Sequence, residues 1–326
     1  MKNKKLNIGI IGCADIAKRH VIPAIIKSPY FNLHSVGTEN LKKHISFFNS
    51  NRIKYVEGYA QIINNSLIDI VYIPLPNKLH YKWAKRTLLS NKHVIVEKPL
   101  ATNLKNVQDL NDIAEKNNLA LLENFQFRFH SQTQFLLDSI QNKIIGELKF
   151  IRSDFCFPFP KNHTNIRYNK ALDGGAFFDT GVYPLKISQL FLGSNISISH
   201  VKFFYDKKYE VDIAGMATLE KESSNIFSQI SFGFGRFYQN SIELYGSKGK
   251  MISKRIFTSP PGKEAKIFME TDKGLEIKII KQQNHFINML YYFNLMLKDK
   301  VLRKKEYKNN FNQSRLINDL NLKNKL

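Results

Sequence analysis

The feature that most constrains the fold of this 326-residue sequence is a regular alternation of apolar runs and amphipathic segments up to residue 122. An apolar run opens the chain, a segment with helical periodicity follows it, and the pair then recurs. The predicted strands are residues 6–12, 32–37, 53–56, 68–73, 93–97 and 119–122, and the predicted helices are residues 14–28, 41–49, 59–64, 80–90 and 106–117. Strands that alternate with helices of this length indicate a parallel, doubly wound sheet covered on both faces.

The rest of the chain has a different pattern, because longer β-rich segments joined by short turns replace the alternation. Short turns connect antiparallel neighbours, so the second sheet is predicted to be largely antiparallel. Its predicted strands are residues 147–157, 198–205, 213–220, 226–234, 240–245 and 250–257, with helices at 129–142, 175–192 and 284–297. The predicted fold is α/β: an N-terminal Rossmann domain (1–123) with a doubly wound parallel sheet, and a C-terminal α+β domain (124–326) with a large, mostly antiparallel open sheet.

The net charge of +22 raises the question of nucleic-acid binding, since clustered cations release counterions from phosphate. The lysines are spread along the whole chain, and the denser stretch 298–308 is interpreted as a solvated terminal helix or tail, so no nucleic-acid partner is expected. No apolar run approaches the ~18 residues of a membrane span, and no membrane partner is expected. The two cysteines, Cys13 and Cys156, indicate neither a metal site nor a disulfide framework and fit a cytoplasmic protein.

The turn after the first predicted strand carries an imperfect dinucleotide-binding fingerprint. Gly12 supplies the first glycine of G-x-G-x-x-G, whereas Ala14 and Ala17 occupy the other two glycine positions. A strand before and a helix after are the context that this motif requires, although a plain strand-to-helix turn is the alternative. We expect the helix N-terminus to hold the cofactor phosphates, with contacts from Gly12, Cys13, Ala14, Asp15 and Ile16.

Glu39, at the end of the second predicted strand, is the candidate that binds the adenosine ribose. A carboxylate there accepts hydrogen bonds from the ribose hydroxyls and repels a 2′-phosphate, which favours NAD over NADP. Lys42 and Lys43 argue the other way, and Glu39 as an ordinary exposed carboxylate remains an alternative. The cofactor prediction is therefore NAD(H) in preference to NADP(H).

Two further loops follow the apolar strands 68–73 and 93–97. Ligands of open α/β sheets bind beyond the carboxyl ends of the strands, so both loops are expected to reach the cofactor. The predicted contacts are Pro74, Leu75, Asn77, His80, Glu97 and Lys98. A lysine at the mouth of a fully apolar strand is poorly explained by packing, so Lys98 is the leading candidate for chemistry, whereas His80 is interpreted as structural or cofactor-contacting.

With two more motifs, these loops resemble the Gfo/Idh/MocA family of oxidoreductases over nearly the whole chain. The residues that carry the resemblance are Gly12-x-Ala14-x-x-Ala17, Pro74 to His80, Glu97-Lys98-Pro99, Glu123-Asn124 and Asp173-Gly174-Gly175-x-x-x-Asp179-x-Gly181-x-Tyr183. The resemblance implies that the nicotinamide lies near Lys98 and the substrate between it and the helix of Asp179 and Tyr183. Independently of the resemblance, these two residues are four apart on a predicted helix and share one face.

Many family members, notably the inositol dehydrogenases, have histidine where this chain has Tyr183. The tyrosine points to the branch with sugar ketoreductases, glucose-fructose oxidoreductase and dihydrodiol dehydrogenases. The hypothesised mechanism is hydride transfer between nicotinamide and a carbonyl carbon, in which Tyr183 exchanges the hydroxyl proton and Lys98 favours the tyrosinate or polarises the oxygen. The predicted substrate-binding residues are Asp179, Arg167, His163 and Asn124; for Arg167 and His163, an exposed surface position is the alternative.

Residues 241–249 and 257–261 are similar to the same region of family members that reduce keto groups on nucleotide-linked sugars. The predicted function is NAD(P)-dependent reduction of such a small-molecule substrate, in polysaccharide or modified-sugar biosynthesis. One alternative is a dehydrogenase of a free sugar, a polyol or a trans-dihydrodiol, and another is a nucleotide-binding redox sensor or scaffold without turnover. A homodimer or homotetramer through the exposed face of the C-terminal sheet is also expected, as the resemblance implies.

Overall fold

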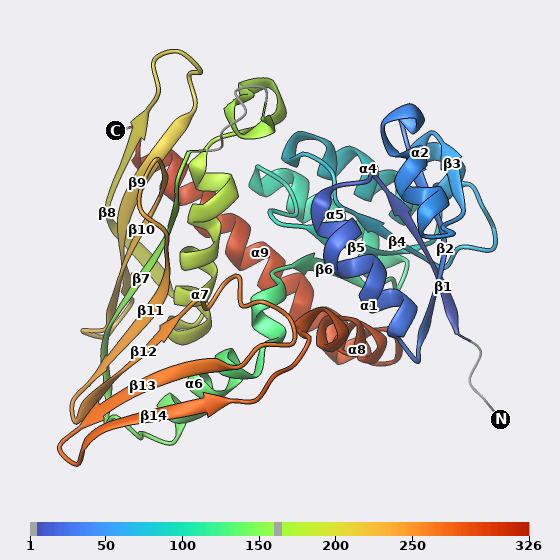
Figure 1. Cartoon of the computed structure of the whole chain (residues 1–326). Helices are drawn as coiled ribbons and strands as arrows, with labels where there is room; N and C mark the ends of the chain where they lie inside the picture. The colour runs from blue at the N-terminus through green and yellow to red at the C-terminus, as the bar shows by residue number, and fades with distance from the viewer. Residues whose placement is uncertain (1–4, 160–164, 326) are drawn as a thin grey trace. The chain divides into compact units, whose positions relative to one another are not determined.

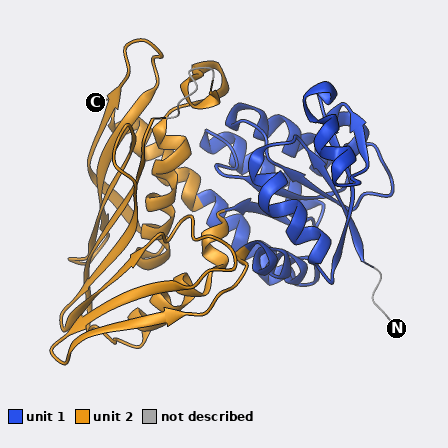
Figure 2. Cartoon of the chain, viewed as in Figure 1, with its two compact units in different colours: residues 1–124, 286–311 blue, residues 125–285, 312–326 orange. Residues whose placement is uncertain are grey.

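The computed structural model describes residues 5–159 and 165–325. The chain forms two compact units, which Figure 2 shows in two colours. Unit 1 comprises Met1–Asn124 and Phe286–Phe311, and unit 2 comprises Phe125–His285 and Asn312–Leu326. The change of unit after Asn124 lies one residue from the boundary predicted from the sequence. The return of residues 286–311 to unit 1 is a feature that the sequence pattern did not indicate.

Unit 1 is built on a six-stranded sheet with the order β3-β2-β1-β4-β5-β6, in which all paired neighbours are parallel. The strands are β1 (Leu6–Ile11), β2 (Phe31–Thr38), β3 (Tyr55–Glu57), β4 (Ile70–Ile73), β5 (His93–Glu97) and β6 (Leu121–Asn124). This is the strand order of dinucleotide-binding sheets, in which the ligand crevice lies where the order reverses, between β1 and β4. The predicted doubly wound parallel sheet is confirmed.

The helices of unit 1 before residue 124 follow the predicted alternation, and two more come from the end of the chain, including the helix predicted at 284–297 in the C-terminal domain. They are α1 (Ile22–Lys27), which continues a widened π-type turn (Ala17–Val21), α2 (Leu41–Ser50), α3 (Tyr59–Ile63), α4 (Asn77–Leu89), α5 (Leu104–Lys116), α8 (His285–Lys298) and the first half of α9 (Lys300–Lys323). Asparagine side chains cap two of them: Asn40 accepts from the amide of Lys43, and Asn103 accepts from the amide of Asn106. Such caps satisfy amides that the first helical turn leaves unpaired.

Unit 2 contains an eight-stranded sheet with the order β14-β13-β12-β11-β7-β10-β9-β8. The strands are β7 (Leu148–Phe157), β8 (Ile196–Tyr205), β9 (Asp212–Lys221), β10 (Phe227–Phe234), β11 (Gln239–Gly246), β12 (Gly249–Lys254), β13 (Ala265–Thr271) and β14 (Gly274–Ile280). Pairing is antiparallel except between β7 and β10, which confirms a mostly antiparallel sheet. Strands β13 and β14 were not predicted, and the segment 298–308, interpreted as a solvated terminal helix or tail, contains the start of helix α9 (Lys300–Lys323).

Helices α6 (Ser131–Gln141) and α7 (Val182–Leu192) cover one face of this sheet together with the end of α9, as Figure 1 shows. A π-type turn (Phe177–Gly181) leads into α7, and short 3₁₀ turns occupy Gln126–Phe129, Ile166–Tyr168 and Lys170–Leu172. Alternate residues of the strands face these helices, so that Ile151, Ile230 and Ile242 are at most 2% exposed. Full burial of such a side chain contributes about 1.5–3 kcal/mol. No helix in the described ranges is both long and apolar enough to span a membrane.

Candidate functional site

The turn between β1 and the first helix has the shape that a phosphate-binding turn needs. Gly12 has a φ of +103°, and a Cβ added to it would lie 2.6 Å from Cδ2 of Leu75. Its amide donates to the carbonyl oxygen of Gly37 over 2.8 Å, which fixes the chain where β1 ends. The helix then starts at residue 15, so its first amides are available near Ala14 and Asp15. These residues fit the phosphates of a dinucleotide, with glycine required at the tightest point.

The other residues predicted in this turn differ in exposure. Cys13 is 9% exposed, and burial raises the pKa of its thiol, so it is a packed neutral residue of the turn. Asp15 is exposed and Ile16 is partly buried. Of the predicted phosphate contacts, Ala14, Asp15 and Ile16 therefore reach the surface of the turn.

At the end of β2, Glu39 is exposed and its carboxylate accepts from the backbone amide of Tyr59 over 3.2 Å. The next residues open α2, whose N-terminus carries Lys42 and Lys43 in its first turn. A helix N-terminus with two cations attracts an anionic group. Lys42 and Lys43 together therefore outweigh the negative charge of Glu39 at the end of β2.

His80 connects the two loops that follow β4 and β5. Its Nδ1 lies 2.7 Å from the carbonyl oxygen of Pro99, and its Nε2 lies 2.7 Å from that of Leu75. The ring is completely buried, and this burial outweighs the two carbonyl acceptors and lowers the pKa of His80 to about 4. The ring is therefore neutral at pH 7 and donates to one oxygen at a time. Its position holds the loop of Pro74 and the loop of Lys98 at a fixed distance.

Glu97 precedes the predicted catalytic lysine, and two hydrogen bonds hold its side chain in place. Its Oε1 accepts from the hydroxyl of Tyr72 and from Nδ2 of Asn124, each over 2.7 Å. Burial raises the pKa of Glu97, and these two donors oppose the rise. Asn124, predicted as a substrate ligand, is 0% exposed and holds Glu97. Lys98 directly follows β5, Asn77 is the first residue of α4, and both are partly exposed.

In unit 2, Arg167 and Asp179 form a two-pronged ion pair. Nε of Arg167 lies 2.6 Å from Oδ2 of Asp179, and its Nη2 lies 3.4 Å from Oδ1. The Asp179 carboxylate raises the pKa of the guanidinium, and Tyr183 contributes in the same direction, which places the three side chains close together. The two side chains of the pair are 35% and 22% exposed, so both still face solvent. Both residues were predicted from the sequence, but their pairing was not.

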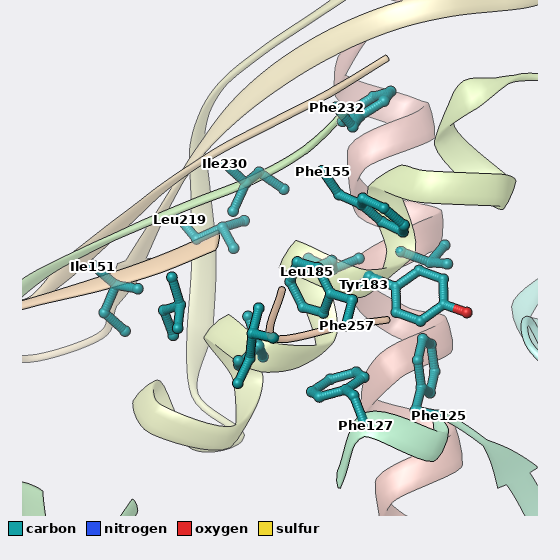
Figure 3. Packing of buried hydrophobic residues seen from close by; sticks show 14 of the residues in the cluster. Phe125, Phe127, Ile151, Phe155, Tyr183, Leu185, Leu219, Ile230, Phe232 and Phe257 are labelled. Atoms are coloured by element: carbon teal, nitrogen blue, oxygen red, sulfur yellow. The ribbon is translucent and has the colours of Figure 1, made fainter. Parts of the chain in front are cut away.

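Tyr183 lies in the first turn of α7, and four phenylalanine rings form a cage around its ring. Phe125, Phe127, Phe155 and Phe257 have ring centroids 5.2–6.0 Å from its ring, and only 7% of the residue is exposed. Figure 3 shows that the ring packs among these side chains while the hydroxyl points out of the cluster. Packing therefore fixes the ring and leaves the oxygen at the edge of the apolar core. The preceding π-type turn is the sort of irregularity that recurs at functional sites.

Asp212, which the sequence analysis did not single out, supports the helix that carries Tyr183. The residue begins β9, is 9% exposed, and accepts from the amide of Phe177 over 2.6 Å. Burial raises its pKa from 3.8 to about 6, although amides of the helix start oppose the rise. Gly175 has a φ of +111°, and a Cβ there would collide with Oδ1 of Asp212. No local sequence signal marks this contact, since 35 residues separate donor and acceptor.

The remaining predicted residue, His163, lies outside the described residues. No group of three or more metal-ligating side chains is found within residues 5–159 and 165–325.

Two family models match the chain. The model of the oxidoreductase family with an NAD-binding Rossmann fold matches residues 6–125, and the model of the Gfo/Idh/MocA C-terminal domain matches residues 133–252. The chain belongs to the Gfo/Idh/MocA family. The family and the oxidoreductase class predicted from the motifs are thus confirmed.

The chain is similar to several characterised reductases and dehydrogenases. The dTDP-3,4-didehydro-2,6-dideoxy-alpha-D-glucose 3-reductase of Streptomyces violaceoruber is 34% identical over 277 residues, 85% of this chain and 81% of the relative. A crystal structure of a 3-ketoreductase from Actinomadura kijaniata with NADP and TDP-benzene matches with a TM-score of 0.93 at 29% identity, covering 98% of each chain. Structures of that enzyme also include variants of one lysine and one tyrosine. A trans-1,2-dihydrobenzene-1,2-diol dehydrogenase of Xenopus tropicalis is 30% identical over 161 residues, 49% of this chain and 48% of the relative.

The preference for NAD derived from Glu39 is wrong. The similar 3-ketoreductase contains NADP in its crystal structures. The physical reason lies in the surroundings of Glu39: its carboxylate is engaged by the amide of Tyr59, and Lys42 and Lys43 supply positive charge at the N-terminus of α2. In the prediction of NAD, one carboxylate was given more weight than two neighbouring cations.

Proposed function

We propose that the protein is an NADPH-dependent 3-ketoreductase that acts on a keto-deoxysugar linked to dTDP. The predicted reduction of a keto group on a nucleotide-linked sugar is the activity named for its relatives over more than four fifths of this chain. The observation that carries the proposal is Tyr183, whose hydroxyl leaves an apolar cage beside the Arg167–Asp179 pair. The match to dihydrodiol dehydrogenases covers only half of the chain, which favours the keto-sugar.

When bound, NADPH supplies a hydride to the carbonyl carbon of the sugar. The chain must then deliver a proton to the carbonyl oxygen, which becomes the new hydroxyl group. Tyr183 is the donor in this proposal, because its ring is held rigidly by four phenylalanines and its oxygen is at the edge of the core. A rigid donor at a fixed position needs little reorganisation during the reaction.

Lys98 has the role of stabilising the negative charge that develops as the proton leaves Tyr183. The loop that carries it is fixed through His80, which contacts the neighbouring Pro99, and through the anchored side chain of Glu97. An ammonium group close to a tyrosine hydroxyl favours the tyrosinate. Crystallographic variants of a lysine and a tyrosine in the Actinomadura enzyme agree with this choice of residue types.

Arg167 and Asp179 orient the sugar. Their ion pair is partly exposed, so its remaining donors and acceptors can bind sugar hydroxyls, and Asp179 keeps the guanidinium in place. For the cofactor, Lys42 and Lys43 bind the 2′-phosphate, and the turn at Gly12 binds the diphosphate.

The test is turnover of NADPH with a dTDP-linked 3-keto-deoxysugar, followed by the absorbance of the nicotinamide. Lys98→Ala and Tyr183→Phe should each lower kcat by at least about a hundredfold, the scale of positioned acid–base catalysis, while NADPH still binds. Unchanged turnover in both variants rules out these roles. Nucleotide binding without turnover of any keto-sugar or polyol would instead support the redox-sensor alternative.

The open face of the unit 2 sheet is the proposed oligomer interface. Within the described residues no helix covers that face, where Leu275, Ile277 and Met216 are 44–67% exposed. A shallow pocket there is lined by Ile252, Phe268 and charged neighbours. Exposed apolar surface of this kind is typical of an interface, so a homodimer or homotetramer is expected. Light scattering that gives the mass of a single chain at micromolar concentration rules it out.

A further inference from the structure

Two segments of unit 2 come together at one end of the sheet: the β10–β11 loop (235–238) and the segment that follows β12 (255–258). The side chain of Asn240, which is 4% exposed, joins them. Its Oδ1 accepts from the amide of Phe257 over 2.8 Å, and its Nδ2 donates to the hydroxyls of Tyr238 and Thr258 over 2.9 and 2.5 Å. A buried asparagine thus holds two hydroxyl groups at the surface.

The hydroxyl groups of Tyr238 and Thr258 have one hydrogen that can be donated to a ligand. The oxygens of Tyr238 and Thr258 also lie 2.7 Å apart, so one of the two hydroxyls donates to the other. Each oxygen already accepts one hydrogen of the Asn240 amide. One hydroxyl hydrogen is left over, and no acceptor for it is recorded in the described part of the chain. The cluster therefore presents a fixed donor to an acceptor such as a phosphate oxygen.

The two segments also carry two arginines and an exposed aromatic ring. Cζ of Arg255 lies 5.5 Å from the ring centroid of Tyr238. Arg236, two residues before Tyr238 in the β10–β11 loop, is exposed, and its Nη1 donates to the carbonyl oxygen of Phe234 over 3.5 Å. Phe237, between Arg236 and Tyr238, is 85% exposed, which packing does not explain. Arg255 has a φ of +59°, a conformation that glycine or asparagine adopts more readily.

The sequence around both segments strengthens the positive charge. Residues 226–242 and 250–263 contain arginine and lysine but no aspartate or glutamate. The cluster is also continuous with the proposed catalytic residue, because Phe257 belongs to the cage of Tyr183, with ring centroids 5.5 Å apart, and precedes Thr258. A ligand that reaches Tyr183 with one end can therefore contact the cluster with another part.

We propose that Arg236, Phe237, Tyr238, Arg255 and Thr258 form the subsite for the nucleoside diphosphate of the substrate. The two arginines and the remaining hydroxyl hydrogen of the Tyr238–Thr258 pair bind the diphosphate, since guanidinium groups suit phosphate oxygens. Phe237 is the platform on which the base stacks. This inference rests on the proposed function, because it assigns the part of the sugar nucleotide that does not react.

The experiment is isothermal titration calorimetry of the full chain, saturated with NADP⁺, with dTDP, inorganic pyrophosphate and thymidine as separate probes. Arg236→Gln and Arg255→Gln should each weaken dTDP and pyrophosphate binding by about tenfold or more, the scale of a lost charge-assisted hydrogen bond. Phe237→Leu should weaken dTDP and thymidine binding by about fivefold or more, as expected for lost stacking, and leave pyrophosphate unchanged. All three side chains are exposed, so the variants should fold.

Arg52→Gln is the matched control, because Arg52 is also exposed and also has a positive φ, of 54°, but lies in unit 1 at the end of α2. It should bind dTDP like the wild type. Binding of dTDP that is equal in the wild type and in all three subsite variants overturns the subsite and leaves the proposed function intact. A wild type that binds NADP⁺ but neither binds dTDP nor reduces a dTDP-linked keto-sugar overturns both.

Discussion

Replacement of Asp212 by asparagine should remove a pH-dependent part of the stability of unit 2. The buried carboxyl group holds the start of the helical segment that carries Tyr183, through the amide of Phe177. Its pKa rises from 3.8 to about 6, and desolvation is the largest cause. Asparagine keeps the shape and one acceptor oxygen but does not titrate, so it isolates the contribution of the proton.

The magnitude follows from proton linkage. Since the folded protein binds this proton more tightly than the unfolded chain does, the group contributes stability that is fully present below pH 3.8 and is lost as the pH rises through about 6. The shift of about two units corresponds to about 3 kcal/mol in total. Between pH 4.5 and pH 7 the linkage relation gives a loss of about 2 kcal/mol in the free energy of unfolding.

Urea denaturation of the wild type and of Asp212→Asn at both pH values measures this quantity. The free energy of unfolding of the wild type minus that of the variant should be about 2 kcal/mol more positive at pH 4.5 than at pH 7. All other titrating groups are shared, so their effects cancel in the difference. A difference that does not depend on pH, or that changes in the opposite direction, refutes the reasoning that desolvation dominates at this carboxyl group.

The remaining predictions concern the cofactor side of the protein. Gly12→Ala places a Cβ 2.6 Å from Leu75 at a φ of +103°, so it should destabilise the protein by about 1–3 kcal/mol and weaken NADPH binding at least tenfold in a fluorescence titration; wild-type affinity would contradict the tight-turn argument. Conversion of both Lys42 and Lys43 to glutamine should raise the KM for NADPH by about tenfold or more and leave that for NADH nearly unchanged, since only NADPH carries the 2′-phosphate. Equal effects on both cofactors would show that the lysines do not bind that phosphate.

The candidate site was predictable where it depends on local motifs. Gly12, Lys98 and Tyr183 stand in short patterns with fixed positions relative to a strand or a helix. In the structure Gly12 directly follows β1, Lys98 directly follows β5, and Tyr183 lies in the first turn of α7. The structure also adds contacts that no motif contains, such as the bridge of His80 between two carbonyl oxygens. The choice of cofactor was predicted incorrectly because the charge around a ribose depends on several side chains together, and Glu39 was given more weight than Lys42 and Lys43.

The same division applies to the fold. Apolar runs of strand length with helices between them determine the parallel sheet of unit 1, because such strands are buried on both faces and their periodicity is visible in the sequence. Helix α9 is the contrasting case, because its lysine-rich start was interpreted as a solvated terminal helix or tail, yet Glu306 and Gln313 are 0% exposed. Glu306 accepts from the hydroxyl of Tyr292, and Gln313 donates to the carbonyl oxygen of Val182, 131 residues away. Polar side chains become interior residues when distant partners satisfy their hydrogen bonds, and only the tertiary structure supplies those partners.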